Sequence, residues 1–329
     1  MNTMDYAHLG RSGLLVSRIG LGTMNFGDAT PEADAYGILD RAVDLGVNFI
    51  DSADVYGGPQ SPDMAQGYGT SEEVIGRWLQ TSGHRDDIVL ATKLYQPMGT
   101  GPNDRRLSAY HIRRACEDSL RRLQTDHIDV YQMHHVDRAT PVEEIWQAME
   151  QLIASGKISY VGSSNFAGWD VTNSHLTAGA RGGLGLVSEQ SIYNLTNRAV
   201  EQELIPALEH FGIGLIPWSP LAMGVLAGRP STGEDALRRS EQGAEFDRLD
   251  AQLAEYQVLC TELGHSPATI AQAWLLHQPA VSTVIAGSRT VDQLEAAVAA
   301  LDIELDATTL AELDRIWPGP GTAPESYSW

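Results

Sequence analysis

Lysine is nearly missing from this chain of 329 residues, because only Lys93 and Lys157 occur among its 22 Lys and Arg residues. Arginine therefore occupies almost every position where a positive charge alone is sufficient. This scarcity favours the hypothesis that a retained lysine is needed for its compact ammonium group, whose pKa is easily tuned. Chance explains either lysine, taken alone, equally well.

The chain also lacks any concentration of basic residues. Its formal net charge is −21, and Lys and Arg cluster no further than in pairs. Since binding to nucleic acid or to anionic membranes requires clustered positive charge, we expect neither kind of partner. The oligomeric state is not indicated by any pattern in the sequence.

Features of secreted and membrane-spanning proteins are absent as well. Cys116 and Cys260 lie far apart without a CxxC motif, and the N-terminal residues MNTMDYAHLGRSG contain no apolar signal core. No window approaches the 18 apolar residues that cross a bilayer. Hydrophobic residues make up 43% of the chain and charged residues 20%, which is ordinary for a globular protein with one large core. We therefore expect a reduced, soluble, cytoplasmic protein.

Short apolar runs rich in β-branched residues recur along the chain, and each is followed by an amphipathic stretch. The expected strands are RIGLGT, VNFID, DIVLATK, HIDVYQMH, ISYVGSSN, GLVSEQSIYN, GIGLIPWSP and VSTVIAG. The expected helices cover residues 31–45, 71–81, 108–123, 141–155, 168–179, 198–211, 245–263 and 290–300, with additional helices at 267–277 and 306–316.

Eight strand–helix alternations predict an α/β fold of the (β/α)8 type, a TIM barrel, formed by a single domain over residues 1–329. A doubly wound open sheet is the alternative, but no GxGxxG motif follows a strand as that fold usually requires for a dinucleotide. Residues 6–9 and 14–17 flank RSG and predict a β-hairpin at the barrel floor. Residues 57–69, 222–244 and 317–329 are expected to form irregular segments, and the first two to lie as long loops over the C-terminal face.

Polar residues interrupt the predicted strands where those strands end. The stretch NFIDSADVYG places Asp51 at the end of one strand and Tyr56 on the following turn, while Lys93 and His134 end the next two strands. Any one of these residues has an ordinary structural explanation, such as a cap, a packing contact or a solvated charge. Because the C-terminal ends of barrel strands converge on one mouth, however, we expect all four to meet.

This group of four suits the reduction of a carbonyl by hydride transfer. Hydride addition leaves negative charge on oxygen, so the site must offer a proton donor that is itself protonated. A nearby ammonium group lowers the pKa of a tyrosine by roughly 1 to 3 units. We therefore expect Lys93 to lower the pKa of Tyr56, Asp51 to hold the ammonium, and His134 to orient the substrate oxygen.

Other strand ends suit a nicotinamide cofactor. Ser164, Asn165 and Gln190 offer hydrogen-bonding groups for a carboxamide, and the indole of Trp218 offers a surface for stacking. A second set follows the last strand at the start of a helix, where an anion is favoured: Gly287, Ser288 and Arg289. An arginine in this place argues for NADPH, which has an additional 2′-phosphate, over NADH.

The sequence resembles the aldo-keto reductase superfamily from about Leu9 to Trp317, and FIDSADVYG, ATK, DVYQMHH and YVGSSNF carry the resemblance. The resemblance implies a catalytic tetrad of Asp51, Tyr56, Lys93 and His134 with Tyr56 as general acid. It also implies contacts to NADP(H) from Gly22, Thr23, Asp51, Ser164, Asn165, Gln190, Trp218, Ser219, Leu221, Gly224, Gly287, Ser288, Arg289 and Gln293.

Within that superfamily, GPNDRRLSAYHIRRACEDSLRRL, HIDVYQMHHVDRATP and KISYVGSSNFAGWD resemble a branch that includes reductases of nucleotide-activated deoxysugars. The insertion GGPQSPDMAQGYG departs from it. Met24 replaces a tryptophan that lines the substrate pocket in many members. Ala296 and Ala297 replace the Glu and Asn that often hold the adenine, which weakens the argument for NADPH over NADH.

Three alternative functions compete with this interpretation. A short-chain dehydrogenase needs a tyrosine four residues before its lysine, but Val89 and Ile153 stand at those positions. A metal site at His134, His135 and Asp137 is disfavoured because adjacent strand residues point to opposite faces. The remaining rival is a regulatory channel subunit of the β type that resembles this family and binds NADPH with little turnover. His134 argues against it, since the resembling group carries Asn there.

Overall fold

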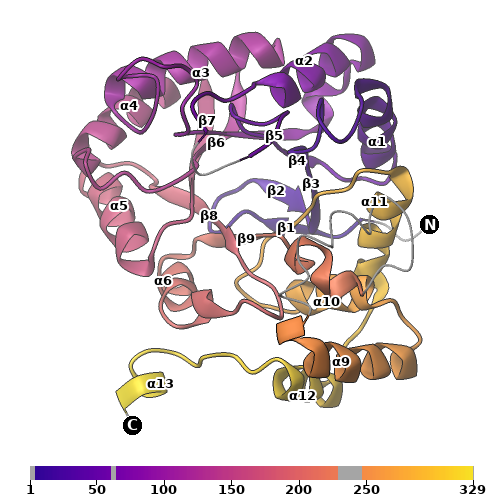
Figure 1. The fold of residues 1–329 in the computed structure, drawn as a ribbon. Helices are drawn as coiled ribbons and strands as arrows, with labels where there is room; N and C mark the ends of the chain where they lie inside the picture. The colour runs from indigo at the N-terminus through magenta and orange to yellow at the C-terminus, as the bar shows by residue number, and fades with distance from the viewer. Residues whose placement is uncertain (1–3, 61–63, 229–246, 329) are drawn as a thin grey trace.

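The strands of the computed structural model, which describes residues 4–60, 64–228 and 247–328, form one parallel sheet rolled into a nearly closed barrel (Figure 1). In order around the sheet they are β10 (Val284–Ala286), β3 (Ile19–Gly22), β4 (Phe49–Asp51), β5 (Val89–Leu94), β6 (Ile128–Met133), β7 (Ile158–Ser164), β8 (Leu186–Ile192) and β9 (Gly214–Trp218). Backbone hydrogen bonds from Leu215 to Ala280, and from Ser282 to Leu215, join β9 to the segment before β10. The (β/α)8 prediction is confirmed, and the doubly wound alternative is wrong.

Helices cover the outside of the barrel, as the alternation predicted. They are α1 (Glu32–Asp44), α2 (Thr70–Ser82), α3 (Ala109–Leu123), α4 (Val142–Ala154), α5 (Gly168–Ala180), α6 (Leu204–Phe211), α9 (Asp250–Leu263), α10 (Pro267–Leu276), α11 (Val291–Val298), α12 (Ala307–Ile316) and α13 (Glu325–Ser328). Short 3₁₀ helices are η1 (His84–Asp87), η2 (Ala199–Glu201), η3 (Ala222–Ala227) and η4 (Ala299–Asp302). Among the described residues, none of the helices has the length and apolar character needed to span a bilayer.

Some boundaries differ from the prediction. The helix expected over 198–211 is divided into η2 and α6, because Pro206 has no backbone N–H and is tolerated only in the first turn of a helix that begins at Leu204. Segments 222–227 and 325–328, expected to be irregular, are helical. The long loops expected at 57–69 and 222–244 lie partly outside the described residues, so their positions over the C-terminal face stay a prediction.

The predicted N-terminal hairpin is present and closes the barrel floor. β1 (Tyr6–His8) pairs antiparallel with β2 (Leu15–Ser17). Leu9 and Val16 are fully buried in one cluster with Phe49 and Val89, which begin strands β4 and β5. The side chain of Ser282 adds a hydrogen bond of 3.0 Å to the carbonyl of His8. The hairpin thus covers the N-terminal end of the barrel.

The barrel interior changes from apolar to polar along the strands. Side chains two residues apart point to the same face, so Ala91 and Lys93 of β5 share the interior, as do Val130 and Gln132 of β6. In both strands the apolar residue belongs to the cluster at the floor, and the polar residue lies closer to the C-terminal end. This gradient collects the buried polar groups at the mouth.

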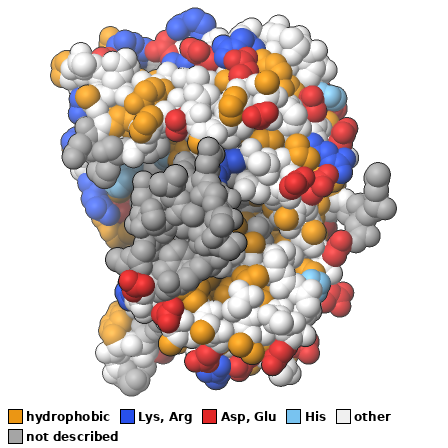
Figure 2. Space-filling model, turned by 45° about the vertical axis from the view of Figure 1, so that its right-hand side comes forward, with side chains coloured by type: hydrophobic (Ala, Val, Ile, Leu, Met, Phe, Trp, Pro, Cys, Tyr) orange, Lys and Arg blue, Asp and Glu red, His pale blue; other side chains and the backbone are white. Residues whose placement is uncertain are grey.

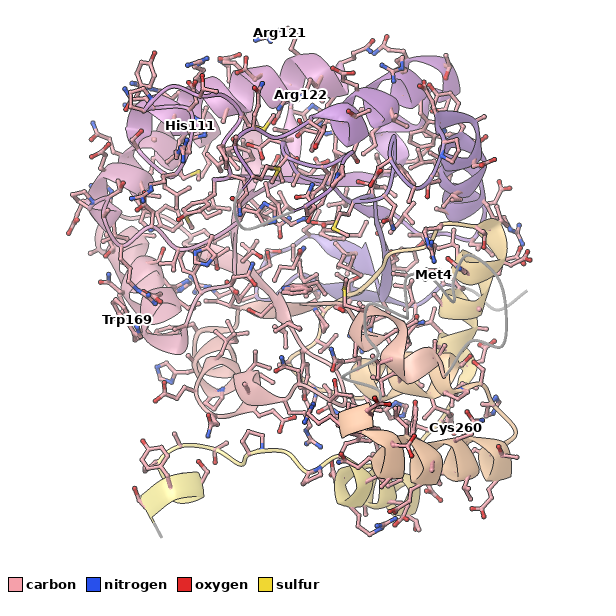
Figure 3. The ribbon with its side chains drawn as sticks, viewed as in Figure 1. Met4, His111, Arg121, Arg122, Trp169 and Cys260 are labelled. Atoms are coloured by element: carbon pink, nitrogen blue, oxygen red, sulfur yellow. The ribbon has the colours of Figure 1, made fainter. Side chains whose placement is uncertain are left out.

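A buried ion pair fastens α3 to α2 and the barrel. Arg121 projects into solvent at the outer rim while the next residue, Arg122, turns inward (Figure 3). The Nε atom of Arg122 donates to Glu72 Oε2 at 2.7 Å, and Thr92 of β5 donates to Glu72 Oε1 at 2.6 Å. On the face drawn in Figure 2, the side chains of both charge signs are interspersed, with no continuous basic field over the described residues.

Helices α2 and α3 approach each other closely at Gly76, and we expect Gly76→Ala to destabilise the protein. A Cβ atom there lies only 2.1 Å from the carbonyl oxygen of Arg122, which is backbone and does not yield easily. The expected loss is about 1–3 kcal/mol of unfolding free energy. The matched control is Gly37→Ala in the exposed middle of α1, where nothing lies within 4 Å and a gain of about 0.5–1 kcal/mol is expected. Denaturant unfolding curves with equal effects for both variants would contradict this packing.

Candidate active site

Four side chains meet at the mouth of the barrel, and Lys93 lies at their centre. Its Nζ atom donates to Asp51 Oδ2 at 2.5 Å, to the backbone carbonyl of Ser52 at 2.9 Å, and to the phenol oxygen of Tyr56 at 3.3 Å. The side chain of Lys93 is fully buried, and that of Asp51 is 3% exposed. Tyr56 stays partly exposed at the mouth, so the buried ion pair supports a phenol that a ligand can reach.

The loop that carries Tyr56 is fastened to the neighbouring elements through its backbone. Thr23 donates to the carbonyl oxygen of Asp51 from both its N–H and its hydroxyl, each at 3.0 Å. Ser71, at the start of α2, donates through its N–H to the carbonyl of Tyr56 at 3.3 Å. Its hydroxyl donates to the carbonyl of Thr23 at 2.8 Å. Strand β3 and helix α2 therefore fix both ends of the segment 51–56.

Gly57 is required at the turn after Tyr56, and Gly58 lies close to a neighbouring side chain. Gly57 has a φ of 101°, which residues with a Cβ atom rarely adopt, and an added Cβ lies 2.5 Å from Thr70. At Gly58 an added Cβ lies 2.6 Å from the ring of Tyr68. The sequence analysis did not derive this second contact, because it depends on a residue ten positions away.

Asp51 accepts three hydrogen bonds from side chains. Its Oδ2 faces Lys93, while Oδ1 accepts from Gln132 Nε2 at 2.8 Å and from Gln190 Nε2 at 2.9 Å. The sequence analysis missed Gln132, because it considered only strand ends. A signal was present, since a glutamine two residues before His134 in a buried strand shares its face.

Burial disfavours the charged form of Lys93, but the hydrogen-bond partners of its ammonium favour that form more strongly. Removal from water lowers the pKa of a lysine, whereas the Asp51 carboxylate and Tyr56 raise it, and the net result is a raised pKa for Lys93. The ammonium is therefore charged throughout the neutral range. This outcome follows from the short contact to Asp51.

The expectation that Lys93 lowers the pKa of Tyr56 below that of a free phenol is wrong in its net direction. Burial raises the pKa of Tyr56 by more than the Lys93 charge lowers it, and Asp51 adds to the rise. The ammonium therefore offsets the cost of burial without reversing it. Tyr56 consequently keeps its proton at neutral pH.

His134 lies beside Tyr56 and is uncharged. The two rings are 5.6 Å apart between centroids and nearly perpendicular at 83°. Burial lowers the pKa of His134 well below its usual value, and Lys93 and His135 lower it further. Its Nδ1 is buried without a hydrogen-bond partner among the described residues, which leaves Nε2 as the ring nitrogen able to reach a ligand.

The structure separates His134 from its neighbour in sequence. His135 is exposed, its Nδ1 bonds to the carbonyl of Val136 at 3.0 Å, and its ring lies 5.3 Å from that of Tyr95. No group of three or more His, Cys, Asp or Glu side chains with metal-binding geometry occurs in residues 4–60, 64–228 and 247–328.

Residues at the ends of β7 and β9 form a connected polar group next to His134. Asn165 has a φ of 58°, and its Nδ2 donates to the carbonyl of His134 at 3.1 Å and to the hydroxyl of Ser164 at 3.0 Å. Its Oδ1 accepts from the indole of Trp218 at 3.2 Å. Ser164 and Asn165, which were predicted to bind a carboxamide, therefore lie next to Trp218, which was predicted to stack on the nicotinamide ring. Gln190 belongs to the same mouth, but its Nε2 donates to Asp51, so Oε1 is the atom it could offer a ligand.

A fully buried carboxyl group anchors the Asn165 segment from behind. Glu189 Oε1 accepts from the N–H of Phe166 at 3.1 Å and from the hydroxyl of Ser191 at 2.6 Å, and Ser163 donates to Oε2. Burial raises the pKa of Glu189 to about 7, although these donors lower it. Glu189 was not singled out from the sequence, because its direction away from the mouth depends on strand register.

The remaining cofactor candidates lie at the ends of β3, β9 and β10. Ser219 has a φ of 55°, and its hydroxyl accepts from the N–H of Met223 at 3.0 Å. Met223 and Gly224 lie in η3, and Leu221 precedes it as the N-cap. In the segment before α11, Gly287 is exposed, Arg289 is partly exposed and Ser288 is buried. The Arg289 N–H donates to Gln293 Oε1 at 2.9 Å. Gly22 and Thr23 are buried beside Asp51, so side-chain contact to a ligand is more restricted there.

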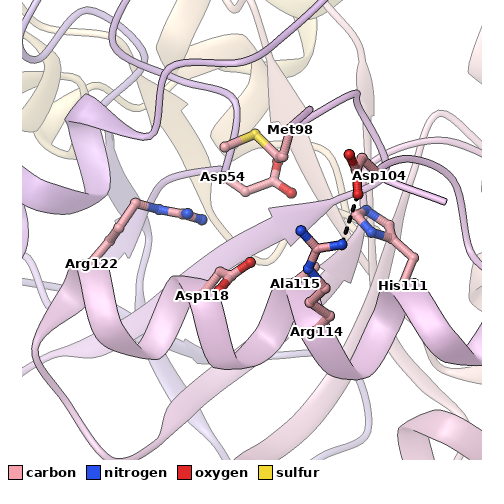
Figure 4. Close-up of a pocket in the computed structure, with 8 residues that line it drawn as sticks. All are labelled: Asp54, Met98, Asp104, His111, Arg114, Ala115, Asp118 and Arg122. Carbon is pink, nitrogen blue, oxygen red and sulfur yellow. Dashed lines mark hydrogen bonds and ion pairs between the residues drawn. The ribbon is translucent and has the colours of Figure 1, made fainter. Parts of the chain in front are cut away.

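A small polar cavity lies outside this mouth, between the loop after β4 and helix α3 (Figure 4). Its volume is about 30 Å³, and its lining includes Asp54, His111 and Arg122. Burial, followed by the charge of Glu72, raises the pKa of Asp54 well above its usual value.

The chain is similar to known proteins along nearly its whole length. Residues 18–318 match the aldo/keto reductase family. The chain is 46% identical to "Uncharacterized oxidoreductase YrpG" of Bacillus subtilis, over 99% of this chain and 100% of the relative. It is 37% identical to a "Probable voltage-gated potassium channel subunit beta" of Oryza sativa, over 91% and 92% of the two chains. It is 32% identical to "Versiconal hemiacetal acetate reductase" of Aspergillus parasiticus, over 94% and 96%. The chain belongs to the aldo/keto reductase family.

Proposed function

We propose that this protein reduces an aldehyde or ketone to the alcohol with NADPH, and that Tyr56 donates the proton. Membership of the family, together with oxidoreductase relatives, supports carbonyl reduction in general. The observation that carries the specific proposal is the position of Lys93, whose buried ammonium contacts both Asp51 and the phenol oxygen of Tyr56.

The residues at the mouth fit a nicotinamide dinucleotide. The indole of Trp218 is partly exposed next to Asn165, which suits a flat ring with an amide group. At Gly287 no atom of the described residues lies within 4 Å of an added Cβ, so within this part of the chain the backbone before α11 leaves room for a phosphate near Arg289. When bound, the cofactor supplies a hydride to the carbonyl carbon. An exposed Ala296 offers the adenine no polar contact, so the preference for NADPH rests on Arg289.

The protein's own groups act on the carbonyl oxygen. Tyr56 holds its proton and hydrogen-bonds to that oxygen, while neutral His134 can donate a second hydrogen bond through Nε2. As negative charge develops on the oxygen, the phenol proton moves to it. The resulting phenolate is stabilised by the Lys93 ammonium 3.3 Å away, and Asp51 keeps the ammonium in place.

The rival function, an NADPH-binding channel subunit with little turnover, is kept because of the relatives so named in Oryza sativa and Arabidopsis thaliana. His134 favours the enzyme, because the resembling group of subunits carries Asn at this position. The substrate proposal is broader than one compound. It includes a nucleotide-linked keto or enoyl deoxysugar, for which the resemblance to the deoxysugar branch is the support.

Steady-state oxidation of NADPH decides between the enzyme and the binder. We expect turnover well above background with some members of a panel of aldehydes, ketones and a nucleotide-linked keto sugar. Tight NADPH binding, measured by quenching of tryptophan fluorescence, without turnover of any compound would support the binder and contradict the enzyme. NADH in place of NADPH tests the contribution of Arg289.

Tyr56→Phe is expected to bind NADPH as the wild type does and to lose at least about 10² in kcat, because it lacks the proton that the carbonyl oxygen needs. Fluorescence titration with NADPH separates a binding defect from a chemical one. Unaltered turnover in this variant would eliminate Tyr56 as the acid.

Lys93→Arg is expected to abolish most activity although the charge is kept, because a planar guanidinium is too long for the buried space between Asp51 and Tyr56. Lys157→Arg is the matched control, since Lys157 is partly exposed and pairs with Glu117 at the surface. We expect wild-type kcat for the control. Wild-type kcat for Lys93→Arg would show that charge alone is sufficient.

A further inference from the structure

Gln132 lies in the barrel interior, where burying an amide is costly unless its polar atoms have hydrogen-bond partners. Its side chain is fully buried in β6, next to Lys93 in the adjacent strand according to the register. Its Nε2 donates to Asp51 Oδ1 at 2.8 Å, although the two residues are 81 positions apart. Since a carboxylate only accepts hydrogen bonds, the nitrogen of the amide must face Asp51.

The two oxygens of Asp51 have different partners. Oδ2 faces the ammonium of Lys93, and Oδ1 accepts from the two amides of Gln132 and Gln190. Donors at Oδ1 stabilise negative charge there and draw it away from Oδ2. Less of the ammonium charge is then neutralised by Asp51, and more of it acts on the phenol of Tyr56.

We propose that Gln132 is a positioning residue for the reaction: its amide orients the Asp51 carboxylate with Oδ2 toward Lys93 and sets how much ammonium charge reaches the Tyr56 phenol. This inference rests on the proposed function, because it assigns a second role at the same site. Gln132 donates to Asp51 through Nε2, and its Oε1 accepts from Gln190 Nε2 at 3.4 Å. Neither bond reaches Tyr56, so Gln132 acts on the phenol through Asp51 and Lys93. A merely structural role would leave the pH dependence of kcat unaltered.

Gln132→Met tests the donor, because methionine has a similar length and no N–H group. We expect NADPH affinity within about twofold of wild type, a loss of about tenfold in kcat at neutral pH, and an alkaline limb of kcat displaced to higher pH. The direction follows from the phenol: without the amide, Asp51 neutralises Lys93 more fully, so the pKa of Tyr56 rises and the phenol becomes a weaker acid.

Gln132→Glu supplies a readout that depends on pH. A protonated glutamic acid keeps the shape of glutamine and can donate to Asp51, whereas the ionised form adds a second carboxylate beside it. We expect kcat relative to wild type to be highest at low pH and to fall as pH rises. This ratio of kcat values tests the positioning role of Gln132 even where Gln132→Met fails to fold.

Thr283→Val is the matched control for altering a buried polar group in the barrel wall. Thr283 is fully buried, and its hydroxyl has no hydrogen-bond partner among the described residues. We expect it to keep the wild-type pH profile. An unaltered profile in Gln132→Met, together with a flat ratio in Gln132→Glu, would overturn this inference while leaving wild-type turnover and the proposed function intact. Absence of wild-type turnover would overturn both.

Discussion

The structure of the mouth depends on one buried ion pair. A lysine ammonium without access to solvent is costly unless a carboxylate lies against it and further acceptors complete its shell. Asp51 at 2.5 Å, the carbonyl of Ser52 at 2.9 Å and the phenol of Tyr56 at 3.3 Å meet this requirement for Lys93. The phenol of Tyr56 is the third acceptor around the ammonium. The hydrogen bonds that stabilise the ion pair therefore also fix the position of the proton donor.

The rest of the barrel can be understood as support for that pair. The hairpin and the apolar residues at the floor exclude water from the N-terminal end of the barrel. Thr23 and Ser71 hold the backbone of Asp51 and Tyr56 from both sides, and Gln132 and Gln190 hold the carboxylate from within. His134 is neutral, so it adds no second positive charge beside Lys93.

Much of this arrangement could be predicted from the sequence, because barrel geometry converts strand ends into neighbours. The alternation of runs placed eight strands, and Asp51, Lys93 and His134 lie on the three adjacent ends where they were expected. Gln132 was missed because it lies inside a strand, where its direction depends on register. The net rise in the pKa of Tyr56 was also missed, since burial depends on neighbours that no local pattern reveals. The division of the helix expected over 198–211 was missed too. Pro206 is accommodated in the first turn of a separate helix that begins at Leu204.

The central claim is that the proton given to the carbonyl oxygen comes from Tyr56 under the influence of Lys93. The most direct measurement is the single-turnover rate of NADPH oxidation as a function of pH, in the wild type and in Tyr56→Phe. The account predicts a wild-type rate that falls at alkaline pH as the phenol ionises, and a small residual rate without this limb in the variant. The same alkaline limb in both proteins would contradict it.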